Sequence, residues 1–152
     1  MQKENKKTNI AAIVFWALSI LCMGVIFWFS SRTANESTNQ SNVFVLWLES
    51  LFGQNEIWVF IVRKSAHCLE FTGLSLLLSC ALYFTKNKTE LPLAVGIASL
   101  YAVTDEIHQI FVEGRSCELR DWIIDTFGAV IGALGFLVLY YIVSGIIKRK
   151  KK

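Results

Sequence analysis

Long, nearly uncharged runs of apolar residues alternate with short polar segments along this chain. A helix needs about 20 mostly apolar residues to cross the hydrocarbon of a bilayer. The first such run contains no charged residue, and the three later runs carry charges only near their ends. The pattern predicts an all-α integral membrane protein with four transmembrane helices in an antiparallel bundle, over residues 10–29, 66–84, 91–111 and 122–143.

A fifth apolar stretch, residues 43–62, is interrupted by Glu49, by a Gly-Gln-Asn sequence and by Glu56. These interruptions favour an extracellular amphipathic helix, then a break and an entry segment into the second span; a re-entrant segment between the first and second spans is the alternative. No repeat or low-complexity linker divides the chain, so residues 1–152 are expected to form a single transmembrane domain.

Composition supports the membrane assignment. Of the 152 residues, 54% are hydrophobic and only 18% are charged, and the mean hydropathy is +0.48. Soluble domains usually have about a quarter of their residues charged. The composition therefore excludes a disordered chain and a disulfide-rich secreted mini-protein. A net charge of +3 also excludes a strongly basic nucleic-acid-binding protein.

Basic residues are concentrated on one predicted side of the membrane. The N-terminal tail, the loop at 85–90 and the C-terminal run at 148–152 together hold 10 of the 15 Lys and Arg residues. Short loops rich in Lys and Arg remain in the cytoplasm. We therefore expect a multi-pass plasma-membrane protein with cytoplasmic N- and C-termini, whose first span is a retained anchor rather than a cleaved signal peptide.

Ionisable and polar side chains gather near the outer ends of the predicted spans. The set consists of Arg32, Arg63, Lys64, His67, Glu70, Asp105, Glu106, His108, Gln109, Arg115, Asp121 and Asp125. At 1.5 Å per residue, Glu70 and Asp105 both lie about 21 Å from the cytoplasmic ends of their helices. Ionisable groups at membrane depth turn towards partners or towards water rather than towards lipid. The sequence therefore predicts an outward-facing polar site among the helices.

Small residues mark the helix faces that should pack together below this site. Gly128 and Gly132 continue the helical stripe of Asp121 and Asp125, and three alanines at 94, 98 and 102 repeat at the same spacing. Small residues four apart allow membrane helices to approach closely. On the third span, Asp105, His108 and Gln109 are expected to share a face.

Several motifs resemble the signatures of VanZ-like membrane proteins. They are RKSAHCLEF at 63–71, DEIHQIF at 105–111, Gly-Arg at 114–115 with Asp121, Asp125, Gly128 and Gly132 after it, and FSSR at 29–32. The resemblance extends from about residue 27 to residue 132. Cys68 replaces an expected aromatic residue and Glu113 replaces a common proline, but the ionisable positions are kept.

The resemblance implies a four-span protein of the bacterial cell membrane. The family's namesake is associated with low-level resistance to teicoplanin, a lipidated glycopeptide that acts at the outer membrane surface. We expect this chain to bind an anionic envelope lipid or a lipid-linked molecule and to contribute to such resistance. Neither a nucleic-acid partner nor an oligomeric state is indicated. The expected ligand-binding residues are Arg32, Arg63, Lys64, Glu106, Gln109, Arg115, Asp121 and Asp125.

Other interpretations of the same residues stay open. A membrane enzyme acting on a lipid-linked phosphate would use His67, Glu70, Asp105 and His108 as candidate acids and bases. No cofactor is predicted, although the same four residues form two i, i+3 pairs that resemble ligands for Zn²⁺ or Mn²⁺. In a third interpretation, the charged residues form ion pairs whose role is only to hold the helices of the bundle together. Transport is disfavoured because the inner halves of the spans are apolar.

Overall fold

The computed structural model describes the backbone of residues 2–150 and the side chains of residues 10–149. Its described part is built from helices without strands, which confirms the all-α prediction. The five helices are α1 (Gln2–Ser30), α2 (Ala34–Phe52), α3 (Ile57–Lys86), α4 (Leu91–Gln109) and α5 (Leu119–Lys150).

Three of the helices are long and apolar enough to cross a membrane. The segments are Ile10–Ser30, Ile57–Lys86 and Leu119–Arg149. The 19-residue helix α4 is not among them, since its last turns contain Asp105, Glu106 and His108. The length and apolar character of these three helices support a membrane protein. That α4 forms a fourth crossing stays a prediction.

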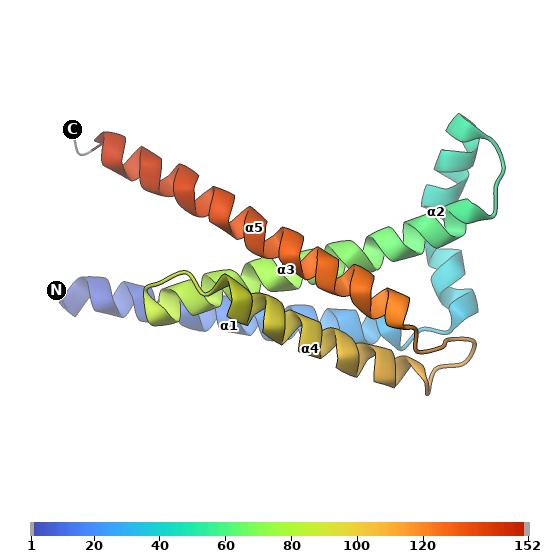
Figure 1. Cartoon of the computed structure of the whole chain (residues 1–152), viewed down its shortest axis with the longest axis horizontal. Helices are drawn as coiled ribbons and strands as arrows, with labels where there is room; N and C mark the ends of the chain where they lie inside the picture. The colour runs from blue at the N-terminus through green and yellow to red at the C-terminus, as the bar shows by residue number, and fades with distance from the viewer. Residues whose placement is uncertain (1, 151–152) are drawn as a thin grey trace.

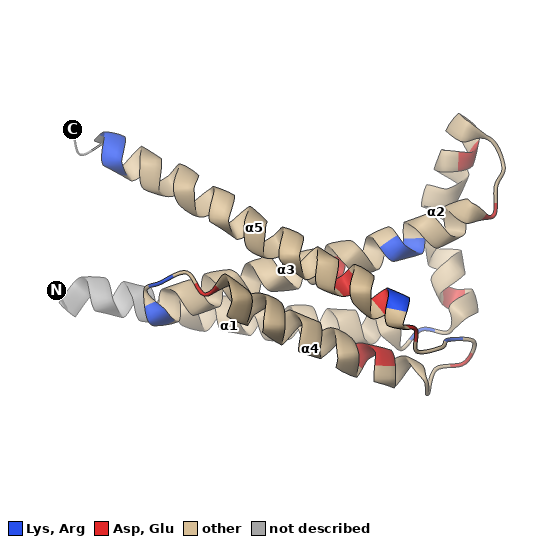
Figure 2. Ribbon diagram, viewed as in Figure 1, with Lys and Arg blue, Asp and Glu red and all other residues tan. Residues whose placement is uncertain are grey.

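The helices α1, α3, α4 and α5 lie side by side and alternate in direction along the chain (Figure 1). The two ends of the chain lie at one end of this arrangement, and α2 projects from the opposite end (Figure 1). Helix α3 is central because it contacts each of the other four helices. Acidic and basic residues gather mainly in the half of the molecule nearest α2 (Figure 2).

The segment between the first two predicted spans differs from its expected boundaries. Helix α2 already begins at Ala34, where the Thr33 hydroxyl accepts from the Glu36 amide at 3.3 Å and the Glu36 carboxylate accepts from the Thr33 amide at 3.1 Å. This reciprocal capping box fixes the helix start. Gly53, at φ +87°, ends α2. Because residues 57–62 are continuously apolar and contain no helix breaker, they belong to α3, which starts nine residues before the predicted 66.

The closest helix contact joins α3 and α5 at two glycines. A Cβ atom on Gly128 would lie 2.3 Å from the Cys68 carbonyl oxygen, and one on Gly132 would lie 2.1 Å from that of Thr72. The Thr72 hydroxyl also donates to the Gly128 carbonyl at 2.9 Å. The three alanines of α4 at 94, 98 and 102 are fully buried. Both predicted small-residue faces are therefore packed against neighbouring helices.

Candidate functional site

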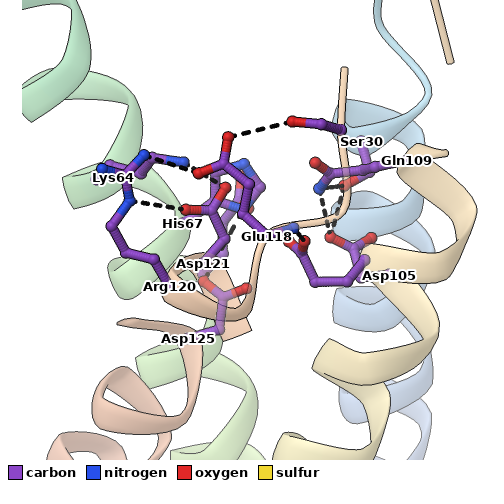
Figure 3. Close-up of polar contacts among 12 residues, drawn as sticks. Ser30, Lys64, His67, Asp105, Gln109, Glu118, Arg120, Asp121 and Asp125 are labelled. Atoms are coloured by element: carbon purple, nitrogen blue, oxygen red, sulfur yellow. Dashed lines mark hydrogen bonds and ion pairs between the residues drawn. The ribbon is translucent and has the colours of Figure 1, made fainter. Parts of the chain in front are cut away.

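The predicted polar residues converge on the end of the bundle nearest α2 (Figures 2 and 3). They come from the end of α1, the first half of α3, the end of α4, the loop at 110–118 and the start of α5. The structure divides them into a buried α1–α4 group, an α3–α5 group and the connecting loop, and two cavities lie among these elements.

The α1–α4 group is centred on the carboxylate of Asp105, whose residue is only 2% exposed. Its Oδ2 atom accepts from the Ser30 hydroxyl at 2.7 Å and from the Gln109 side-chain amide at 3.0 Å (Figure 3). The other carboxylate oxygen of Asp105 is buried without a hydrogen-bond partner among the described residues. This network joins the end of α1 to the end of α4 and uses most of the donors near Asp105.

The buried face of α4 differs from the predicted one. Asp105, Glu106 and Gln109 are buried, whereas His108 is half-buried and lies against α1. The His108 Nε2 atom lies 3.1 Å from the Ser31 hydroxyl, and its ring centroid lies 4.3 Å from that of Phe27. Because α4 packs against both α1 and α5, its buried face is wider than one helical stripe.

The α3–α5 group places His67 between two carboxylates. His67 Nδ1 lies 3.9 Å from Glu70 on its own helix and 4.0 Å from Asp125 on α5. The side chain of Asp125 is 1% exposed, and neither of its carboxylate oxygens has a hydrogen-bond partner in the described part of the chain. His67 is therefore the nearest basic group to a deeply buried carboxyl group (Figure 3).

One turn nearer the end of the bundle, Lys64 forms an ion pair with Asp121 (Figure 3). Both side chains are mostly buried, at 19% and 15% exposure. The Lys64 ammonium also lies 5.6 Å from the centroid of the Phe60 ring. Lys64 is thus paired with one carboxylate oxygen of Asp121, and this ion pair connects α3 to the start of α5; the other oxygen, Oδ1, is buried without a hydrogen-bond partner among the described residues.

The four residues that resemble metal ligands in the sequence do not form one cluster in the structure. His67 belongs to the α3–α5 group, whereas His108 contacts α1. Across the described residues, His, Cys, Asp and Glu side chains nowhere form a group of three that could hold a metal ion. The two i, i+3 pairs therefore lie in separate surroundings.

Arg115 connects the 110–118 loop to the end of α1. Its Nε atom donates to the Arg32 carbonyl at 2.9 Å and its Nη2 atom to the Phe29 carbonyl at 3.5 Å. Carbonyl groups at a helix C-terminus lack partners within the helix, and a basic side chain stabilises them. The Nη1 atom is buried without a partner among the described residues. Burial lowers the pKa of Arg115, but an arginine stays charged at neutral pH.

The loop reaches this position through a turn at Gly114, which has φ +74°. Left-handed backbone at this angle is accessible to glycine without strain. A Cβ atom there would also lie 3.1 Å from the Ala34 Cβ atom. Gly114 therefore allows Arg115 to reach back to α1.

Two predicted ligand-binding residues have contacts within the protein. Glu106 accepts from the backbone amide of Glu118 at 2.8 Å, so this carboxylate caps the start of α5. The guanidinium of Arg32 lies over Trp28, 4.5 Å from the ring centroid, and 3.9 Å from the Glu36 carboxylate. The part of Arg32 that faces the site is its backbone carbonyl.

Two cavities share Arg63 and Arg115 in their linings. The smaller, of about 180 Å³, is polar and includes residues that the sequence did not single out, namely Phe60, Ser116, Glu118 and Arg120. The Ser116 hydroxyl donates to Glu118 at 3.1 Å, and this bond together with Arg120 lowers the pKa of Glu118. The negative charge of Glu118 is thus retained at the cavity.

The larger cavity, of about 240 Å³, also contains His67 and Glu70. The opposite side of this cavity is formed by one face of α2, which consists of Ser37, Gln40, Ser41 and Phe44. Residues at i, i+3, i+4 and i+7 share one face of a helix. The spacing in the sequence therefore places these four residues on one face of α2, but it does not show that this face lies against the site.

Comparison with known proteins gives one family match. The VanZ/LLP1 family matches residues 15–142, which include every predicted site residue. No curated protein and no solved structure gives a significant match to the chain. Because the match covers most of the chain and agrees with its motifs, this membrane protein belongs to the VanZ/LLP1 family.

Proposed function

We propose that this protein binds the anionic group of a membrane lipid or lipid-like envelope molecule between Arg63 and Arg115. The observation that carries the proposal is that two positively charged side chains, Arg63 and Arg115, line both cavities at this end of the bundle. Guanidinium groups that line the same space attract an anion and can form charge-assisted hydrogen bonds with its oxygen atoms. The planar guanidinium suits phosphate.

Arg63 supports the same position for the anion. It lines both cavities and has no hydrogen bond or ion pair with a described residue. Lys64 differs because its charge is already paired with Asp121. A purely structural ion-pair network accounts for Lys64 and Asp121 but leaves Arg63 without a role.

The chemistry of the larger cavity favours an amphiphile. Arg63, Arg115 and His67 contribute polar groups, whereas Phe29 and Phe44 contribute apolar surface. Ligand sites usually combine apolar walls with a few polar groups that fix orientation. A molecule with an anionic group next to a hydrocarbon chain fits both parts of this lining.

The length of α3 supports a site at the level of lipid headgroups. Arg63 and Lys86 are 23 residues apart, which corresponds to about 35 Å along a helix. The hydrocarbon core of a bilayer is about 30 Å thick. If Lys86 lies at the cytoplasmic surface, Arg63 lies in the outer headgroup region. The concentration of Lys and Arg in the termini and in the loop at 85–90 favours the same orientation.

We propose that α4 is the fourth crossing helix of this bacterial cell-membrane protein, with both termini in the cytoplasm. Its polar last turns weaken its apolar character, but Asp105, Glu106 and Gln109 are buried against other helices. Such burial within the protein makes polar residues tolerable at membrane depth.

The link to glycopeptides follows from this location. Teicoplanin is a lipidated glycopeptide that acts at the outer membrane surface, and the namesake of the family is associated with low-level resistance to it. By holding an anionic envelope lipid at this surface, the protein would alter access for such antibiotics. Cells expressing Arg115→Gln should become as susceptible as cells without the protein. Equal susceptibility of Arg115→Gln and wild-type cells at equal expression would contradict this part of the proposal.

Binding itself is tested on the purified full chain in nanodiscs. Native mass spectrometry should find anionic phospholipid bound to the wild-type protein and to Arg149→Gln, a charge-matched control at the other end of the molecule. Arg63→Gln and Arg115→Gln should each weaken binding about tenfold or more, since hydrogen bonds to charged groups contribute about 1.5–3 kcal/mol. Unchanged binding by both site variants would overturn the proposal.

A second candidate function is catalysis on a lipid-linked phosphate, and the position of His67 favours it. Its imidazole lines the larger cavity within 4.0 Å of Asp125 and 3.9 Å of Glu70. A carboxylate beside a histidine can orient the ring and stabilise its protonated form, as a general base requires. Incubation with phospholipid followed by lipid mass spectrometry should then show a product with the wild-type protein and none with His67→Gln. Absence of a product with the wild-type protein would exclude this candidate.

A further inference from the structure

We propose that the ligand is a phosphodiester lipid with a neutral, hydroxylated headgroup, which lies in the smaller cavity while the hydrocarbon chain enters the larger one. This inference rests on the proposed function, because it takes the phosphate to lie between Arg63 and Arg115. The carrying observation is that two chemically different cavities share these two arginines.

The smaller cavity offers both hydrogen-bond donors and hydrogen-bond acceptors. Besides Ser116 and the two shared arginines, its polar lining includes Lys64, Arg120, Glu118 and Asp121. Lys64 is paired with Asp121, and Arg120 lies 2.7 Å from the Glu118 carboxylate, so these four charges balance one another. Such a paired surface favours neither a second anionic group nor a cationic one. Hydroxyl groups donate and accept hydrogen bonds equally well. The lining therefore fits a glycerol-like or sugar-like headgroup better than a charged one.

The smaller cavity has a volume of about 180 Å³. This space has room for a compact headgroup such as a glycerol or one sugar ring. A larger headgroup would have to extend beyond the cavity.

The larger cavity provides the surface for the beginning of the chain. The aromatic rings of Phe29 and Phe44 and the aliphatic side chains of Val62 and Ala66 line it. The arginines lie between this apolar lining and the polar cavity, and a phosphodiester occupies the same place between the chain and the headgroup of a lipid. A phosphomonoester lacks any group for the smaller cavity, and a fatty acid also lacks the phosphate.

This arrangement makes a prediction opposite to that of simple charge attraction. Phosphatidic acid, a phosphomonoester, carries more negative charge than phosphatidylglycerol, a phosphodiester with a glycerol headgroup. Attraction by Arg63 and Arg115 alone would favour phosphatidic acid. Occupation of both cavities favours phosphatidylglycerol.

The test uses the full chain in phosphatidylcholine nanodiscs that contain either phosphatidylglycerol or phosphatidic acid with identical acyl chains. Native mass spectrometry should show several-fold preference for phosphatidylglycerol in the wild-type protein and in Arg149→Gln. Ser116→Trp fills the smaller cavity, so it should reduce phosphatidylglycerol binding to the level of phosphatidic acid without weakening phosphatidic acid binding. Ala66→Phe fills the larger cavity and should weaken both lipids.

The outcomes separate this inference from the proposed function. Preference for phosphatidic acid by the wild-type protein, or an equal loss of both lipids in Ser116→Trp, would overturn the headgroup assignment but leave anion binding intact. Where Ser116→Trp does not fold, Arg120→Gln tests the same cavity, because its side chain is 59% exposed and tolerates change. Undiminished binding of both lipids by Arg63→Gln and by Arg115→Gln would instead overturn the proposed function.

Discussion

Arg115 donates a hydrogen bond from its Nε atom to the backbone carbonyl of Arg32, with 2.9 Å between the two atoms. This bond connects the Gly-Arg motif before α5 to the Phe-Ser-Ser-Arg motif at the end of α1. Arg115 also lines both cavities, so the residue that makes this bond borders the proposed binding site. One guanidinium therefore holds the loop in place and presents a charge to both cavities.

A lysine at this position should not replace the arginine. Arg115→Lys keeps the charge, but a single ammonium cannot both cap the α1 carbonyls and reach a phosphate through a second nitrogen. We expect binding of phosphatidylglycerol by Arg115→Lys to fall close to that of Arg115→Gln, as measured by native mass spectrometry. Binding within twofold of wild type would show that charge alone is sufficient.

The glycine contact between α3 and α5 should be intolerant of any side chain. Gly128→Ala places a Cβ atom 2.3 Å from a backbone carbonyl oxygen, and overpacking of this kind costs about 1–3 kcal/mol or more. Thermal unfolding in detergent should show a clear decrease in Tm. Gly96→Ala is the matched control, since nothing lies within 4 Å of its added Cβ atom. Equal Tm values for the two variants would contradict the contact.

Two neighbouring serines should differ in their effect on stability. Ser30→Ala removes a buried donor to Asp105, which should destabilise the fold by about 1–3 kcal/mol because the buried carboxylate oxygen loses one of its two hydrogen bonds. Ser31 follows the last residue of α1 and is exposed; its hydroxyl donates to the Phe27 carbonyl and lies 3.1 Å from His108 Nε2 at the surface. Ser31→Ala should therefore change the Tm little. The same unfolding assay compares the two variants, and a larger loss in Ser31→Ala would argue against the α1–α4 network.

The fourth membrane crossing can be tested by labelling cysteines in intact cells. In a chain whose four cysteines are replaced by serine, Asn55→Cys should react with a membrane-impermeant maleimide from outside. Lys88→Cys should react only after permeabilisation, since its loop is predicted to be cytoplasmic. A third variant that retains only Cys117 should be labelled from outside. Labelling of Lys88→Cys and Cys117 from the same side would show that α4 does not cross the membrane.

The ion pair and hydrogen bond at Glu118 should make a small, pH-dependent contribution to stability. Its pKa is lowered in the folded protein, chiefly because the Ser116 hydroxyl donates to it. The resulting stabilisation is fully present above the pKa of the unfolded chain and disappears as the pH falls through the lowered folded value. The Tm of wild type should exceed that of Glu118→Gln at pH 7, and the difference should vanish in acid. A Tm difference between wild type and Glu118→Gln that grows as the pH falls would contradict a lowered pKa of Glu118 in the folded protein.

Much of the fold follows from local patterns in the sequence. The apolar runs give the long helices, and the four-residue spacing of Gly128 and Gly132 gives the contact face of α5. Helical spacing, however, predicts only the face of the helix on which a side chain lies, and not the residue that it contacts on another helix. The pairing of Ser30 with Asp105 was therefore not predictable, because it depends on how α1 and α4 lie against each other.

Glu106 and Arg32 show a second limit of the sequence. Both were predicted to bind a ligand because they are charged and lie near the outer membrane surface. In the structure the Glu106 carboxylate caps α5, because the 110–118 loop folds back onto α4 and brings the Glu118 amide to it; binding of a ligand by Glu106 stays a prediction. Arg32 contacts the site through its backbone carbonyl, which accepts from Arg115. A sequence pattern of side-chain types cannot predict a contact that the backbone makes.

The glycines of α5 also determine electrostatics. Where the backbones of two helices touch directly, no flexible side chain lies between them, so the distance between the helices is fixed. Charged side chains next to such a contact are therefore also held at a fixed distance from one another. His67 and Glu70 on α3 and Asp125 on α5 flank the contact of Gly128 with Cys68. Gly128, which has no side chain, consequently determines the electrostatic field that these three ionisable groups create at the site.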